Sequence, residues 1–373
     1  MIFVRTSDLK TGMRLARPIY AKTGVLLYER NSKLTSQAIE SIRSFGLIGM
    51  FILEPAEPVP PMTQADLDFE RFQTMNVFSI KEELEKIVSS GHPSRIQIIV
   101  ANIIKSYGHM DKKINFVQNL RSKEDYIYKH TLNVSMLCTM MTHVMNIKVA
   151  EQLETVTAAI VHDIWMLRLP QELVDKEELT DDDRRSIAAS RTAAYDLIDA
   201  AFSAQPNIKR ICMQACRDRN SQENTKMVDG AKILLVAHTF DTMTAMQFDK
   251  PPASEVAAVK YLLENPDQFD QEAVEALISS INIISPGVSV ELNNGDKALV
   301  LSENQYDILR PMLLSFRDNT IIDLSNEIEY GDLEIVDAMK TMDNRCIMDT
   351  ETLKKFGVKV EDPGHVEVPD DNK

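Results

Sequence analysis

Residues 158–163 read Ala-Ala-Ile-Val-His-Asp, and this stretch decides the predicted fold. The apolar run predicts a buried helix, and its last two residues place an imidazole beside a carboxylate. Both groups are good ligands for a first-row metal ion. A histidine on an apolar helix is, however, more often a hydrogen-bonded core residue than a ligand. On spacing alone, the pair His162 and Asp163 therefore favours a core role.

Two histidines on other apolar segments extend this pattern. His130 lies in YIYKHTLNVSML, and His238 lies in AKILLVAHTFDTMTAM. Apolar residues recur around both at helical spacing, which predicts that both side chains point into a helical bundle. Three helices would then bring His130, His162 with Asp163, and His238 together as candidate metal ligands.

Helical periodicity continues outward from these motifs over residues 64–285. Residues 54–62, EPAEPVPPM, contain four prolines and predict an extended linker. Residues 1–53 alternate short apolar runs with turn residues, which predicts a small β-rich domain with one helix starting near Leu34. The predicted fold class is therefore mainly α, preceded by a β-rich N-terminal domain.

Two features follow the helical segment. Residues 285–304, SPGVSVELNNGDKALVLSEN, alternate apolar and polar residues around an Asn-Gly turn, which predicts a C-terminal β-hairpin. Residues 332–343, DLEIVDAMKTMD, predict one more helix. We therefore divide the chain into a β-rich domain (1–53), a proline-rich linker (54–65), a helical domain with the hairpin (66–325) and an acidic tail (326–373).

The composition of the 373-residue chain is that of an ordinary globular protein, with 44% hydrophobic and 26% charged residues. The formal net charge of −15, without a Lys/Arg block, argues against nucleic acid or a membrane surface as the main partner. Four scattered cysteines favour a reducing compartment, and the N-terminus shows no apolar run of signal-peptide length. We therefore expect a cytoplasmic protein, and a homodimer formed through helices is compatible with this organisation.

The order of the segments HTLNVS, AAIVHDIWMLRLP, AKILLVAHTFDTMTA and SPGVSVELNNGDKALVLSEN resembles the HD-GYP branch of the HD metal-dependent phosphohydrolases. The resemblance covers roughly residues 120–315. It implies a helical bundle with a small β-hairpin. It also implies hydrolysis of cyclic di-GMP or a related cyclic dinucleotide with two or three metal ions, often iron or manganese.

Carried over residue by residue, the resemblance places His130 at the first histidine ligand of the family and His162 with Asp163 at its His-Asp pair. His238 stands where the family has a ligand aspartate, and Asp241 matches the second acidic position. Histidine can still bind a metal ion, but it brings no negative charge. The resemblance thus implies part of a metal site.

Other family positions are replaced in this chain. Tyr126 stands where many members place a glutamate ligand, and Ser190 stands at the next histidine. Cys216 and Arg217 take the place of a histidine pair, and the Gly-Tyr-Pro loop is absent from CRDRNSQENTK. The resemblance therefore implies that a second metal ion has lost its ligands.

Three further replacements surround the implied pocket. Met166 stands at the lysine that follows the His-Asp pair, and Trp165 stands at a glycine, where its ring is expected to crowd the pocket. Gln247 and Lys250 stand at the arginines near the bound dinucleotide. Lys250 and Arg217 remain candidate ligand-binding residues.

Two interpretations of the site stay open. Either His130, His162, Asp163 and His238 hold one divalent ion (Fe, Mn, Zn or Ni), or Arg217 balances Asp163 as a buried ion pair without a metal. For function, we expect a catalytically impaired signalling protein that acts through a protein partner or a cyclic dinucleotide. The alternative is a divergent phosphodiesterase with Asp163 as its catalytic bridging carboxylate.

Overall fold

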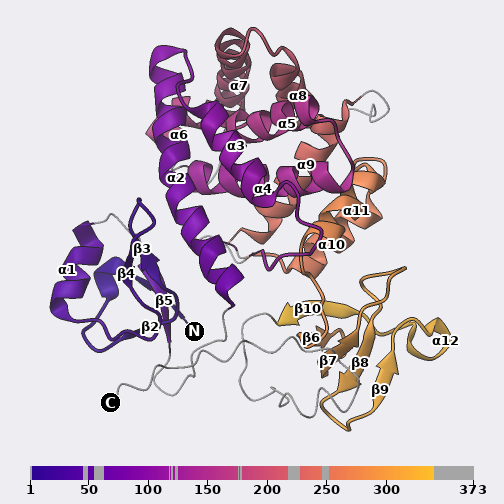
Figure 1. Ribbon diagram of the computed structural model, residues 1–373. Helices are drawn as coiled ribbons and strands as arrows, with labels where there is room; N and C mark the ends of the chain where they lie inside the picture. Colours follow the sequence, from indigo (N-terminus) through magenta and orange to yellow (C-terminus); the bar gives the residue numbers. More distant parts are fainter. Residues whose placement is uncertain are drawn as a thin grey trace, which may run out of the picture. The chain divides into compact units, whose positions relative to one another are not determined.

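The computed structural model describes residues 2–44, 49–53, 63–116, 118, 121, 125–174, 176, 179–216, 227–245 and 252–339. The chain forms two compact units, one of residues 72–283 and one of residues 1–71 with 284–373. Figure 1 labels their elements.

The N-terminal part combines short strands with one described α-helix, as the alternation of apolar runs and turns predicts. Strands β1 (Ile2–Arg5), β5 (Gly49–Leu53) and β2 (Arg14–Leu15) form an antiparallel sheet in the order β1-β5-β2. A short 3₁₀ turn (Thr6–Asp8) follows β1, and β3 (Ile19–Tyr20) pairs with β4 (Leu26–Tyr28). Helix α1 (Ser36–Ser44) supplies Ile39 and Ile42 to the core of this part.

The helical unit contains the segment where apolar residues recur at helical spacing, so the mainly α fold is confirmed. Its described helices are the part of α2 (Gln64–Ser90) from residue 72 onward, α3 (Ile96–Tyr107), α4 (Tyr126–Val144), α5 (Val149–Val161), η2 (Ile164–Arg168), α6 (Gln171–Val174), α7 (Asp181–Ala201), α8 (Asn207–Ala215), α9 (Asp229–Thr244), α10 (Glu255–Glu264) and α11 (Gln271–Ser280).

Helix α4 is the centre of this unit, because it packs against α3, α5, α9 and α11 (Figure 1). It is buried on nearly every side from Ile127 to Thr142. A helix surrounded in this way must satisfy its polar side chains internally. The hydroxyl of Thr131 accordingly donates to the carbonyl of Ile127 at 2.8 Å, and that of Thr139 donates to the carbonyl of Ser135 at 2.8 Å.

Helix α9 approaches α5 and α8 closely at its first turn. A Cβ atom added to Gly230 would collide with the hydroxyl of Thr155 and lie 2.9 Å from a side-chain carbon of Ile211. Glycine at this position therefore permits a spacing between helices that a side chain would widen. This spacing brings α9 to the end of α5, where the His-Asp pair lies.

The C-terminal part contains the predicted hairpin and more. Strands β6 (Ser289–Leu292) and β7 (Lys297–Ser302) form the hairpin, with Ser289 opposite Leu299. The strands β8 (Met312–Ser315), β9 (Ile321–Asp323) and β10 (Ile335–Met339) extend it to an antiparallel sheet in the order β10-β6-β7-β8-β9, and a short helix α12 (Glu327–Tyr330) precedes β10.

The helix predicted for residues 332–343 is wrong in its described part. Residues 335–339 form β10 at one edge of the sheet, where Ile335 lies opposite Leu292 of β6. Pairing with β6 decides the conformation of this stretch, because local helix propensity is a weak preference that tertiary contacts override. The linker residues 54–62 and the tail residues 340–373 lie outside the described residues.

No described helix is both long enough and apolar enough to cross a membrane.

Candidate metal centre

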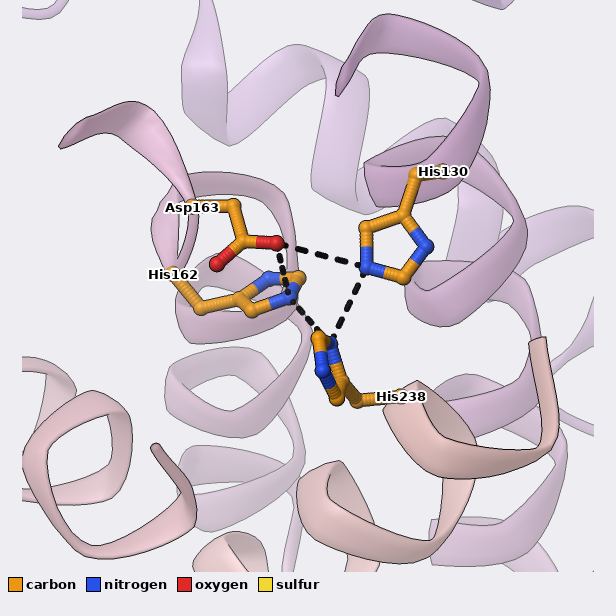
Figure 2. A group of neighbouring side chains, drawn as sticks. All are labelled: His130, His162, Asp163 and His238. Carbon is orange, nitrogen blue, oxygen red and sulfur yellow. Dashed lines mark hydrogen bonds and ion pairs between the residues drawn. The ribbon is translucent and has the colours of Figure 1, made fainter. Parts of the chain in front are cut away.

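Four side chains from three helical segments converge in the helical unit (Figure 2). His130 comes from the first turns of α4, and His238 comes from the middle of α9. His162 is the residue at which α5 ends, and Asp163 follows it where η2 begins. The helix thus stops at the His-Asp pair, and the turn lets two adjacent side chains point to the same place. We call these four residues the cup.

The donor atoms of the cup have the spacing of metal ligands. Nδ1 of His238 lies 3.0 Å from Nε2 of both His130 and His162. Oδ2 of Asp163 lies 3.5 Å from Nε2 of His130 and 3.4 Å from Nε2 of His162. Neighbouring ligands around one ion with bonds of about 2.0–2.1 Å lie roughly 3.3 Å apart in a tetrahedral site. Four of the six donor pairs are close to this distance and all six lie within 4.8 Å, so the four residues form a candidate site for one ion.

The hydrogen bonds of the two innermost histidines direct lone pairs into the cup. Nδ1 of His162 donates to the carbonyl of Ala159 at 2.8 Å, and Nδ1 of His130 donates to Oδ2 of Asp241 at 2.6 Å. A carbonyl and a carboxylate can only accept, so in each neutral ring Nε2 carries a lone pair. The two Nε2 atoms face one Nδ1 of His238, which can donate a single proton. A cation satisfies all of these lone pairs at once.

The buried environment keeps the cup free of competing protons. Burial lowers the pKa of His162 and lowers that of His238 to about 3, although nearby Asp163 acts in the opposite direction. Burial would raise the pKa of Asp163, but the three imidazoles and an indole N–H outweigh it and hold this pKa below its usual range. At neutral pH His162 and His238 are therefore neutral and Asp163 is a carboxylate, the protonation states that metal binding requires.

The second oxygen of Asp163 faces different surroundings. Its Oδ1 accepts a hydrogen bond of 2.9 Å from the indole N–H of Trp165. The guanidinium carbon of Arg191 lies 4.7 Å from the centre of the Trp165 ring, and Ser190 donates to the carbonyl of Trp165 at 3.2 Å. The carboxylate oxygen that would bridge to a second metal ion thus already accepts a hydrogen bond from the indole of Trp165.

The residues expected to replace the second set of ligands do not form a metal site in the described part of the chain. Ser190 uses its hydroxyl on the backbone of Trp165. Burial raises the pKa of the Cys216 thiol to about 12, with nearby Asp163 adding to the effect. Arg217, Gln247 and Lys250 lie outside the described residues, and the ion pair between Arg217 and Asp163 stays a prediction.

Tyr126 lies beside the cup and brings no charge to it. Its ring stacks on His130 with a centroid distance of 5.3 Å and an interplanar angle of 17°. Burial, assisted by Asp241, raises the pKa of Tyr126 to about 12. At the position where a glutamate is expected from the resemblance, this chain therefore has an uncharged aromatic ring that packs on His130.

Sequence reasoning missed the partners of Asp241. It noted this carboxylate only as a matching acidic position, whereas the structure pairs it with His130, Arg121, Gln118 and Asn133. The available signal was the His-x-x-Asn spacing on an apolar helix: Asn133 follows His130 by three residues, which places both on one helix face. Arg121, in the polar stretch LRSKED, offered none.

Comparison with known families agrees with this geometry. Residues 116–273 match the family model described as HD domain. The match spans all four residues of the cup and supports the HD superfamily for this segment, a metal-dependent phosphohydrolase type of fold. No match was found among curated proteins.

Proposed function

We propose that this protein is a degenerate HD-GYP-type signalling protein whose cup holds one divalent ion and does not support two-metal hydrolysis. Three imidazole nitrogens and one carboxylate oxygen form a donor set suited to Zn, Fe, Ni or Mn. Two-metal hydrolysis requires a second cation about 3.5–4 Å from the first, held by its own ligands. In this proposal the helical unit acts through binding rather than turnover.

The observation that carries the proposal is the hydrogen bond from Trp165 to Oδ1 of Asp163, 2.9 Å long. A bridging carboxylate must give one oxygen to each metal ion. Here one oxygen faces the histidines and the other faces an indole N–H. When an ion is bound, it supplies positive charge to the centre of the bundle. His130, His162, Asp163 and His238 would hold it, and these residues tie α4, α5 and α9 together.

The partner classes follow from the same proposal. We propose a cytoplasmic protein that contacts another signalling protein or binds a cyclic dinucleotide without hydrolysing it. Arg217 and Lys250 are the proposed ligand-binding residues. A homodimer formed through the helices belongs to the same proposal.

One observation favours the alternative of a divergent phosphodiesterase. His238 is partly exposed, whereas the other three members of the cup are buried. A bound ion could therefore meet a phosphate ester from the side of His238, with Asp163 as the catalytic carboxylate. The alternative requires that a single ion and the side chains around it perform the hydrolysis.

Elemental analysis of protein purified without chelator tests the proposal. The wild type is compared with a His162→Ala, Asp163→Ala double variant. The matched control is a His143→Ala, Asp111→Ala variant, because these residues form another His-Asp pair, 3.2 Å apart, at the surface. We expect about one ion per chain in the wild type and the control, and none in the cup variant.

Turnover is measured on the same preparations with cyclic di-GMP and a chromogenic phosphodiester, with Mn, Fe, Zn or Ni added. We expect no hydrolysis above the level of the cup variant. Two ions per chain, or turnover that Asp163→Ala abolishes, would establish the phosphodiesterase instead. A folded wild type that takes up no metal would contradict both functions.

A further inference from the structure

A buried polar network lies directly behind His130. It consists of Gln118, Arg121, Asn133, Asp241 and Thr244, each at most 8% exposed. Buried charges are costly unless they are paired and fully hydrogen-bonded. A buried charged network behind the candidate ligand His130 therefore indicates a specific role for its residues.

The carboxylate of Asp241 is the centre of the network, and both of its oxygens are fully used. Arg121 binds it in a bidentate manner, with one N–H bond of 2.6 Å to each oxygen. Oδ1 also accepts from the amides of Gln118 and Asn133, each at 3.0 Å. Oδ2 accepts from Nδ1 of His130 at 2.6 Å. The position of the carboxylate is thus fixed by donors from two segments of the chain, the stretch with Gln118 and Arg121 and helix α4.

Helix geometry links this network to the cup. Asp241 follows His238 by three residues on α9, and Asn133 follows His130 by three residues on α4, so each pair lies on one helix face. Because α4 packs against α9, the two faces meet. One turn of α9 therefore supplies both a member of the cup and the hydrogen-bond partner of another member.

We propose that Asp241, held by Arg121, is a positioning residue that fixes the His130 ring with Nδ1–H toward itself and the Nε2 lone pair toward the cup. The inference rests on the proposed metal-binding function and names the residues that prepare one ligand for it. A carboxylate behind a ligating histidine fixes its tautomer and orientation and strengthens it as a ligand. Arg121 balances the charge of Asp241 in the absence of an ion, so the ligand is in place before metal arrives.

The first test locates the ring proton in metal-free protein by long-range ¹H–¹⁵N correlation NMR of ¹⁵N-histidine-labelled chain, with His130 assigned from a His130→Gln variant. We expect the proton on Nδ1 of His130. A neutral ring with its proton on Nε2 would overturn the inference. This readout needs no metal ion, so it decides the inference even where the wild type binds none and the proposed function fails.

The second test measures the affinity for Co²⁺ by absorption titration in a Asp241→Asn, Arg121→Met double variant. This variant removes both charges of the buried pair together, which is better tolerated than removing one. The matched control is Thr244→Val, a change of similar volume at a network hydroxyl that accepts from Gln118 at 2.9 Å and donates to the carbonyl of Phe240 at 2.8 Å. Circular dichroism confirms that both variants fold.

We expect Co²⁺ binding about 10- to 100-fold weaker in the double variant, the range typical of lost partners of metal-ligating histidines. The control is expected to bind within about threefold of the wild type. Equal affinity in the folded double variant and the wild type would overturn the inference, and equal loss in Thr244→Val would show a packing effect instead. Should the double variant fail to fold, the ring-proton measurement on the wild type alone decides.

Discussion

The two oxygens of Asp163 face regions of opposite character. On the histidine side, Oδ2 lies 3.4–3.5 Å from ring nitrogens of His162 and His130 that carry lone pairs. On the tryptophan side, Oδ1 already accepts from Trp165, whose ring is stacked against Arg191. Around Oδ2 there are more hydrogen-bond acceptors than protons to share among them. Around Oδ1 there is already an N–H donor, from Trp165, and a nearby cation, the guanidinium of Arg191.

The difference explains how one carboxylate can belong to a metal site without bridging two ions. A cation is attracted where lone pairs converge with no hydrogen atom between them. On the other side, a cation would have to displace the indole N–H and lie near the guanidinium of Arg191. The difference between the two sides therefore favours one ion.

The largest expected effect comes from Arg121, which supports the histidine side. Arg121→Met leaves Asp241 buried without its charge partner, and the two side chains are 0% exposed. We expect a loss of about 3–5 kcal/mol in the free energy of unfolding, measured with urea. On the tryptophan side, Arg191→Met removes a stacked cation and should cost about 0.5–1 kcal/mol. Similar costs for both variants would show that the two sides are equally supported.

A second change removes the negative charge of the cup without altering its shape. In Asp163→Asn, the amide oxygen can still accept from Trp165, but an NH₂ group faces His130 and His162 in place of an acceptor. We expect Zn²⁺ affinity to fall by at least roughly 100-fold, more than for a change behind a ligand. Competition with a chromophoric chelator measures it. Unchanged affinity would remove Asp163 from the ligand set.

Acid should destabilise the metal-free protein through the histidine side. The pKa of His238 is about 3 in the folded protein against an ordinary 6.5, so between these values the unfolded chain binds a proton that the folded protein does not. Stability then falls as pH falls, by about 2 kcal/mol from pH 7 to pH 5 for this histidine alone. The lowered pKa of His162 acts in the same direction.

Urea unfolding of metal-free protein at pH 7 and pH 5 checks the acid effect. In His238→Asn one of the titrating rings is missing, so the difference between the two pH values should shrink. A difference as large in His238→Asn as in the wild type would contradict the assignment to this histidine.

The smallest effect is expected on the tryptophan side. Trp165→Phe keeps an aromatic ring for Arg191 and deletes the hydrogen bond to Asp163, which should cost about 1.5–2 kcal/mol because the acceptor is charged. Metal content should stay at one ion per chain, since the described residues hold no second group of His, Cys, Asp or Glu with the spacing of metal ligands. A second ion per chain in this variant would show that Trp165 alone excludes it.

Much of the fold and of the cup could be predicted from local patterns. Helical spacing of apolar residues marked α4, α5 and α9, and it predicted that the three histidines point into the bundle. In the structure His130 and His162 are buried and His238 is partly exposed. The hairpin β6–β7 was marked by alternation around Asn294 and Gly295. The edge strand β10 was not, because its conformation depends on pairing with β6, more than forty positions away.

The sequence by itself determined which side chains are available to the cup, because residue type and periodicity fix donor atoms and helix faces. Tertiary structure alone decided how those donors are paired. His130 meets Asp241 across 111 positions, and Arg121 meets it across 120. Contacts between such distant residues leave no periodic signal in the chain, since they arise only when packed helices bring two faces together. The direction of Trp165 toward Asp163 likewise depended on the turn that follows α5.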